Sequence, residues 1–135
     1  MNDENRRLRV KGRRTSGSFL KLDKELLAHP NFVKLTPRGV KLLVDLGSYY
    51  NGSNNGDLTT AKSILKERGW RSNSNLVAAL EELRYYQFVK VTRQGCKGIC
   101  TLVLLTFFPV NESKGKHSFR TTPIAPNDYK ATKKR

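Results

Sequence analysis

The sequence predicts an α+β domain in which helices come first and a β-hairpin comes last. Two observations predict this class. Between residues 37 and 85, apolar residues recur three and four positions apart, as on the buried faces of helices. Residues 88–93 and 100–108 are then rich in branched and aromatic side chains, and the glycine-containing residues 94–99 join them. With 135 residues, the chain has room for one domain, expected at residues 18–110, between two tails.

The first long helix is expected at residues 37–50. Thr36 followed by Pro37 is typical of an N-cap and the first helical position. One face of the segment contains Val40, Leu43, Val44 and Gly47, and it is widened by Leu42, Leu46 and Tyr50. A helix with such a face is expected to be part of the core.

Residues 51–57 form a turn cluster rich in Asn and Gly. Glycines would let backbone amides approach a phosphate, but the segment lacks the Lys-Ser/Thr ending of a nucleotide-binding loop and no strand precedes it. We therefore interpret it as a plain connection. Leu58 and Thr59 are expected to form a minimal strand, after which Thr60 caps the next helix.

Residues 58–85 have the pattern of a short helix, a tight turn and a longer helix. The apolar residues of the short helix have helical spacing: Ala61, Ile64 and Leu65. Gly69 follows where a left-handed turn residue is needed, and the short polar side chains of residues 72–75 suit the N-cap of the longer helix. Its buried stripe is expected to contain Leu76, Ala79, Leu80 and Leu83.

The first turn of the longer helix is the candidate binding surface. It carries hydrogen-bond donors and acceptors without an apolar residue: Arg71, Ser72, Asn73, Ser74 and Asn75. A helix with such a first turn, preceded by a helix and a small turn, has the shape that enters a major groove of DNA. Asn73 and Asn75 suit adenine, and Arg71 suits guanine or a phosphate. Because phosphate repels acids, Glu81 and Glu82 are expected on the side away from the duplex.

A two-stranded hairpin directly after a helix-turn-helix is the wing of a winged helix-turn-helix domain. The predicted fold therefore has three main helices, a C-terminal β-hairpin wing and basic flexible tails. Arg93, Gln94 and Lys97 near the wing tip would meet phosphate or the minor groove; an ordinary solvated hairpin is the alternative. Thr60 and Lys62 are further candidates for phosphate contact.

The charge favours a polyanionic partner. The chain has 26 Lys and Arg against 11 Asp and Glu, a net charge of +15. A charge this large repels itself unless an anion is bound, and nucleic acid is the first candidate. An anionic membrane is second, but the sequence lacks an apolar run of the ~18 residues that a spanning helix needs. It also lacks a basic helix with one bulky apolar face.

Both tails are basic. Residues 1–17 contain six basic and two acidic residues and are expected to form a disordered arm that lies on phosphates or enters a minor groove; a tail without a role is the alternative. Residues 111–135 contain seven basic and two acidic residues and are expected to be extended or disordered. Phe119, Ile124 and Tyr129 would dock on this domain or a partner, stack on bases, or remain in a loose tail. The tail residues expected to contact DNA are Arg13, Arg14, Lys133, Lys134 and Arg135.

The sequence gives little support for metal binding, catalysis or small-molecule binding. Cys96 and Cys100 are expected to be reduced thiols, because a metal site would need two more ligands and the two histidines lie far away in the sequence. Only two histidines, His29 and His117, are available for a catalytic arrangement, so no enzyme, cofactor or small-molecule ligand is expected. The polar N-terminus has no signal-peptide pattern, which indicates a cytoplasmic, nucleoid-associated protein.

The chain resembles the winged helix-turn-helix proteins of bacterial mobile elements, phages and plasmids, including replication-initiator DNA-binding domains. The residues that carry the resemblance are 35–37 (LTP), 49–52 (YYNG), 54–58 (NNGDL), 79–83 (ALEEL) and 88–91 (FVKV). It covers residues 19–109. Relatives usually have a glycine before the first wing strand, where this chain has Tyr86-Gln87. The resemblance implies DNA binding without catalysis.

Three functions remain open at this point. We expect a sequence-specific double-stranded DNA-binding protein, a transcriptional regulator of a mobile element or phage that binds a repeated half-site as a homodimer. A replication-initiation or partition protein is the alternative. In a third reading, the protein binds RNA or the nucleoid non-specifically and its charge alone matters.

Overall fold

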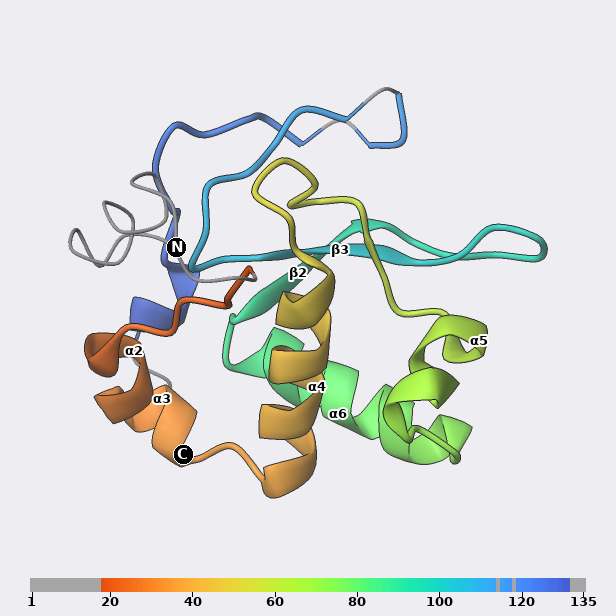
Figure 1. Ribbon diagram of the computed structural model, residues 1–135, viewed down its shortest axis with the longest axis horizontal. Coiled ribbons are helices and arrows are strands. Elements are labelled where there is room, and N and C mark those ends of the chain that lie inside the picture. Colours follow the sequence, from red (N-terminus) through yellow and green to blue (C-terminus); the bar gives the residue numbers. More distant parts are fainter. Residues whose placement is uncertain (1–17, 114, 118, 132–135) are drawn as a thin grey trace, which may run out of the picture.

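The computed structural model describes residues 18–113, 115–117 and 119–131. In this part of the chain, five α-helices accompany a three-stranded antiparallel sheet (Figure 1), which confirms the α+β class. The α-helices are α2 (Lys24–Ala28), α3 (Pro30–Val33), α4 (Pro37–Tyr49), α5 (Lys62–Leu65) and α6 (Asn73–Tyr85). The strands are β1 (Leu58–Thr59), β2 (Val89–Arg93) and β3 (Leu102–Leu105), and the 3-10 turns are η1 (Lys66–Arg68) and η2 (Asp128–Lys130). None of the described helices is long and apolar enough to cross a membrane.

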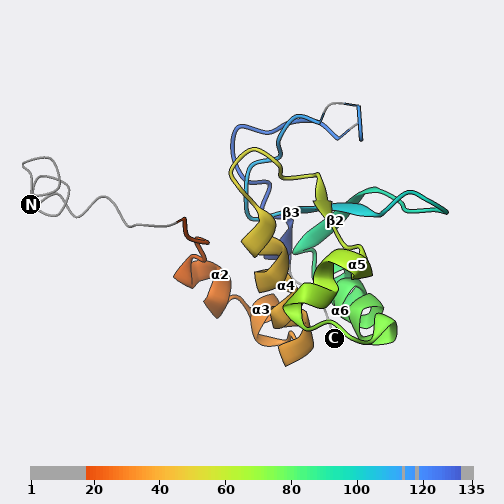
Figure 2. The same ribbon diagram turned by 45° about the vertical axis from the view of Figure 1, so that its right-hand side comes forward.

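The sheet has the order β1-β3-β2, so the two consecutive strands of the hairpin pair and β1 joins the far edge of β3. Val89 lies opposite Leu105 and Val91 opposite Val103, with a register shift before Arg93. The hairpin extends past the sheet, as Figure 2 shows from a second direction. In this extension Cys96 pairs with Ile99 as an isolated antiparallel bridge.

The second hairpin strand is shorter than the predicted residues 100–108. The chain turns directly after β3, where the Phe108 N–H donates to the Leu105 carbonyl. The Asn55 side chain forms hydrogen bonds with this turn. Its Nδ2 donates to the Leu105 carbonyl over 2.8 Å, and its Oδ1 accepts from the Leu105 N–H over 2.7 Å. The side chain of Asn55 thus fastens the loop of residues 51–57 to the end of the sheet.

The helix α4 begins where Thr36 and Pro37 predict it. The Thr36 hydroxyl accepts a hydrogen bond from the Gly39 N–H, which satisfies one free donor of the first turn. The predicted buried face of α4 is wrong at Val44, which is 40% exposed. The next residue, Asp45, is buried in its place. The Asp45 carboxylate accepts hydrogen bonds from the Trp70 indole N–H and from the Lys41 ammonium group.

The expected cap of the next helix is also wrong. The N-cap residue of α5 is Ala61, and Thr60 still belongs to the sheet edge, where its N–H donates to the Thr101 carbonyl. The Thr59 hydroxyl accepts from the Ala61 N–H. No side chain among the described residues therefore caps the first turn of α5.

Turn chemistry defines both ends of α6. Gly69 has φ 93° and supplies the left-handed residue of the turn, and Ser72 caps the helix by accepting from the Asn75 N–H. Leu76, Ala79 and Leu83 are buried as expected, while Leu80 is partly buried. At the C-terminal end, Gln87 takes φ 63°. Gln87 therefore adopts the left-handed conformation that glycine usually adopts at such a position.

Residues beyond 110 contribute to the hydrophobic core. Tyr129 is buried and stacks on Phe88, with ring centroids 5.2 Å apart and planes 14° from parallel. The Asn31 side chain donates to the Tyr129 carbonyl over 2.7 Å, and Lys90 pairs with Asp128. Of the alternatives for the C-terminal segment, docking on the domain therefore applies to Tyr129. Ile124, by contrast, remains 74% exposed.

Candidate nucleic-acid interface

The first turn of α6 presents its polar side chains at the surface. Arg71, Asn73, Ser74 and Asn75 are exposed, and Ser72 is half-buried. The Ser72 hydroxyl is committed to the helix start, since its oxygen accepts from the Asn75 N–H over 3.3 Å and lies 2.9 Å from the Ser74 hydroxyl. Of the five predicted readout residues, Ser72 is thus a cap, and the other four face solvent.

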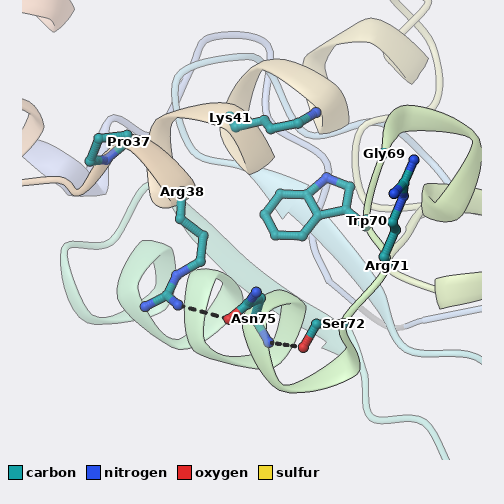
Figure 3. Close-up of a pocket in the computed structure, with 8 residues that line it drawn as sticks. All are labelled: Pro37, Arg38, Lys41, Gly69, Trp70, Arg71, Ser72 and Asn75. Atoms are coloured by element: carbon teal, nitrogen blue, oxygen red, sulfur yellow. Dashed lines mark hydrogen bonds between the residues drawn. The ribbon is translucent and has the colours of Figure 1, made fainter.

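A residue that the sequence did not single out contacts this turn. Arg38, in the first turn of α4, donates from Nη1 to Oδ1 of Asn75 over 3.1 Å (Figure 3). The contact orients the Asn75 carboxamide, because its oxygen faces the guanidinium. Since Arg38 and Asn75 are 37 positions apart, their proximity depends on how α4 packs on α6. The only local sequence feature that pointed to Arg38 was its positive charge in the polar first turn of α4.

A hydrogen-bond network around the buried side chains of Trp70 and Asp45 lies next to this contact. The Trp70 indole N–H donates to Oδ2 of Asp45 over 2.7 Å, and the Lys41 ammonium donates to the same oxygen over 2.7 Å. Lys41 also donates to the Arg68 carbonyl over 2.7 Å, and its ammonium lies 5.6 Å from the centroid of the Trp70 ring. Lys41 thus offsets the charge of Asp45, as a buried carboxylate requires. The network ties α4 to the turn that precedes α6.

A cavity of about 420 Å³ lies between α4 and the start of α6. In Figure 3 the ring of Trp70, which lines the cavity, lies between the side chains of Arg38 and Arg71. It is lined by Pro37, Arg38, Lys41, Gly69, Trp70, Arg71, Ser72 and Asn75. Three of the five predicted readout residues, Arg71 among them, therefore line one pocket together with two further cations, Arg38 and Lys41.

The two adjacent acids of α6 have different surroundings. Glu82 is half-buried and accepts from the Thr36 N–H over 2.6 Å and from the Thr36 hydroxyl over 2.8 Å. Gly39 makes room for this carboxylate, because a Cβ there would lie 2.3 Å from Glu82 Oε1. Glu81 is exposed and pairs with Arg84 over 2.9 Å. Glu82 therefore faces α4.

The hairpin separates its three predicted contact residues. Arg93 is half-buried and donates from Nη2 to the Cys100 carbonyl over 3.0 Å, whereas Gln94 and Lys97 are exposed near the tip. The pKa of the Cys100 thiol is lowered, first by a hydrogen bond from Thr59 and then by the charge of Arg93, which outweigh the opposing effect of burial. Arg93 is thus engaged within the hairpin, while Gln94 and Lys97 are available to a partner.

The remaining predicted residues lie at the start of α5 or outside the described chain. Lys62 is exposed at the first position of α5, and Thr60 is half-buried beside it. The tail residues Arg13, Arg14, Lys133, Lys134 and Arg135 lie outside the described residues. Within residues 18–131 as described, no group of three or more His, Cys, Asp or Glu residues is placed to hold a metal, and Cys96 and Cys100 are free and exposed.

No family model matches this chain, and no curated protein or solved structure shows significant similarity to it. Its function therefore has to be argued from its own residues.

Proposed function

We propose that this protein binds double-stranded DNA in a sequence-specific manner through a winged helix-turn-helix domain, as a transcriptional regulator of the kind carried by phages and other mobile elements. The order of elements supports the fold. A core helix (α4), an edge strand (β1), two helices joined by a tight turn (α5 and α6) and a hairpin (β2 and β3) follow one another, with strand order β1-β3-β2. In this arrangement α6 is the recognition helix and the hairpin is the wing.

The observation that carries the proposal is the placement of the polar first turn of α6 relative to the hairpin tip. Both lie on the same side of the molecule in Figures 1 and 2. A duplex against that side would meet Asn73 and Asn75 in its major groove and Lys97 on the flank. Asparagine side chains pair with adenine through one donor and one acceptor, which suits them to base readout.

Charge supplies the affinity in this proposal. The chain carries +15, so phosphate neutralisation and the release of condensed counterions favour binding without regard to sequence. The bases are then read by a small set of side chains on α6. We therefore expect tight binding at low salt and a steep loss of affinity as salt is added.

The proposal assigns no catalysis to the described residues. The imidazole of His29 accepts from the Asn31 N–H as the cap of α3, and the His117 side chain is 1% exposed with Nε2 3.5 Å from the Asp57 carboxylate. His29 thus has a structural role as the cap of α3.

Selection from a pool of random duplexes, with unlabelled random duplex and RNA as competitors, tests the proposal. Enrichment of one motif that outcompetes random duplex supports sequence-specific binding. Equal competition by RNA and random duplex would identify a non-specific nucleic-acid binder instead. Once a motif is known, promoter activity and copy number of a plasmid that carries it separate a regulator from a replication or partition protein.

A further inference from the structure

The pocket between α4 and α6 contains two guanidinium groups whose charges are not offset locally. Lys41 compensates Asp45, with their charged atoms 2.7 Å apart. Arg38 donates to the neutral carboxamide of Asn75, and among the described residues neither Arg38 nor Arg71 forms an ion pair. The pocket thus has a net positive charge.

The walls of the pocket combine this charge with apolar surface. Trp70, which is 5% exposed, lines the cavity, and Pro37 and Gly69 complete the apolar lining. Cations at the edge of a low-dielectric cavity attract an anion more strongly than cations on open surface. Arginine matches the geometry of a phosphate with two parallel N–H donors. A ligand with a phosphate beside an apolar ring would satisfy both parts of the lining.

We propose that this pocket is a phosphodiester-binding site, in which Arg38 holds one backbone phosphate of the DNA strand and Arg71, on the other side of Trp70, holds a neighbouring phosphate, while the sugar between them covers Trp70. The assignment rests on the proposed DNA binding and adds residues to it. It makes α4 part of the interface, and it gives Arg38 two partners: Asn75 in the free protein and the phosphate in the complex. Release of the Asn75 oxygen from Arg38 then leaves the whole carboxamide for a base.

Salt dependence separates a phosphate contact from a purely structural role of Arg38. Each phosphate that a protein neutralises contributes about 0.9 to the slope of log K against log salt concentration. Arg38→Gln is expected to reduce the slope by about this amount, whereas Arg38→Lys keeps the charge and most of the slope. Lys24→Gln removes an equal charge from the exposed face of α2 and serves as the matched control with an unchanged slope.

The single tryptophan gives an independent readout, because Trp70 is the only one in the chain and lines the pocket. Its fluorescence is expected to change when the selected duplex saturates the wild-type protein. The change should be smaller in Arg38→Gln at saturating duplex and unaffected in Lys24→Gln. Ribose 5-phosphate, a phosphomonoester of a pentose without a strand, is the comparison ligand and is expected to produce little change at matched phosphate concentration.

The outcomes distinguish this assignment from the proposed function. If the wild-type protein binds no duplex, the proposed function and this assignment both fall. If it binds duplex but Arg38→Gln and Lys24→Gln have the same slope, DNA binding stands and the pocket assignment is wrong. Weaker binding of Arg38→Gln with an unchanged slope means that Arg38 only orients Asn75, which also overturns it. A saturable response to ribose 5-phosphate stronger than that to duplex would assign the pocket to a free phosphate ester.

Discussion

The carboxylate of Glu82, on α6, accepts a hydrogen bond from the backbone N–H of Thr36, the N-cap of α4, over 2.6 Å. The contact joins the two helices that form the candidate interface. It also places a negative charge at the positive end of the α4 dipole. The relative position of Arg38 and Asn75 therefore depends on a carboxylate that does not itself touch the pocket.

We expect Glu82→Ala to lower the free energy of unfolding by about 1–2 kcal/mol, because it removes a charge-assisted contact and a helix-capping group. Urea denaturation measures the loss. Glu81→Ala is the control and should change stability by less than about 0.5 kcal/mol, since Glu81 forms only an exposed pair with Arg84. Equal effects of the two substitutions would show that the contact with Thr36 contributes nothing to stability.

Asn73→Ala tests base readout by α6. The exposed side chain is expected to discriminate at one base pair, so its loss should relax the preference there by about 1–3 kcal/mol. Competition between the selected duplex and single-base variants measures this. Lys62→Ala, at the start of α5, should instead lower the affinity for all duplexes by the same factor. Equal weakening of cognate and random duplex by Asn73→Ala would exclude readout at this residue.

The C-terminal tail tests the non-specific part of the affinity. Replacing Lys133 and Lys134 with Ala is expected to weaken cognate and random duplex alike and to lower the salt slope by up to about 0.9 per lost contact. Titrations at several salt concentrations measure both quantities. A changed ratio of cognate to random affinity would contradict the expectation and assign the tail a role in specificity.

Tyr129→Ala is expected to destabilise the domain by about 3–5 kcal/mol, because it removes a buried ring stacked on Phe88 and leaves a cavity. Thermal or urea unfolding measures the loss. Ile124→Ala in the same segment should cost less than about 0.5 kcal/mol, since Ile124 is 74% exposed. A negligible cost for Tyr129→Ala would mean that residues after 110 do not belong to the cooperative unit.

The lowered pKa of Cys100 predicts its reactivity. A lower pKa means a larger thiolate fraction near neutral pH, so alkylation of Cys100 should begin at lower pH in the folded protein than in denatured protein. A Cys96→Ser background isolates this thiol. Thr59→Val and Arg93→Gln should each move the midpoint of the rate profile to higher pH, because each removes a cause of the lowering. An identical midpoint in folded and denatured protein would contradict the prediction.

The sequence predicted helix caps and turns correctly where one or two neighbouring residues determine the backbone conformation. Thr36-Pro37 predicted the start of α4, and Gly69 and Ser72 predicted the turn and cap before α6, because caps and left-handed turns depend on the residue itself. The hairpin was also predicted from local residues, but its second strand was predicted to be longer than the observed β3. Its end depends on Asn55, 50 positions away from Leu105.

Only the tertiary structure decided which distant residues meet. Arg38 reaches Asn75, Asp45 receives Trp70, and Tyr129 enters the core against Phe88, and each contact joins segments at least 25 positions apart. The polar first turn of α6 and the basic composition were thus properties of the sequence itself. The pocket beside that turn, with its two uncompensated arginines, exists because α4 packs across α6, and no local pattern encodes such a packing.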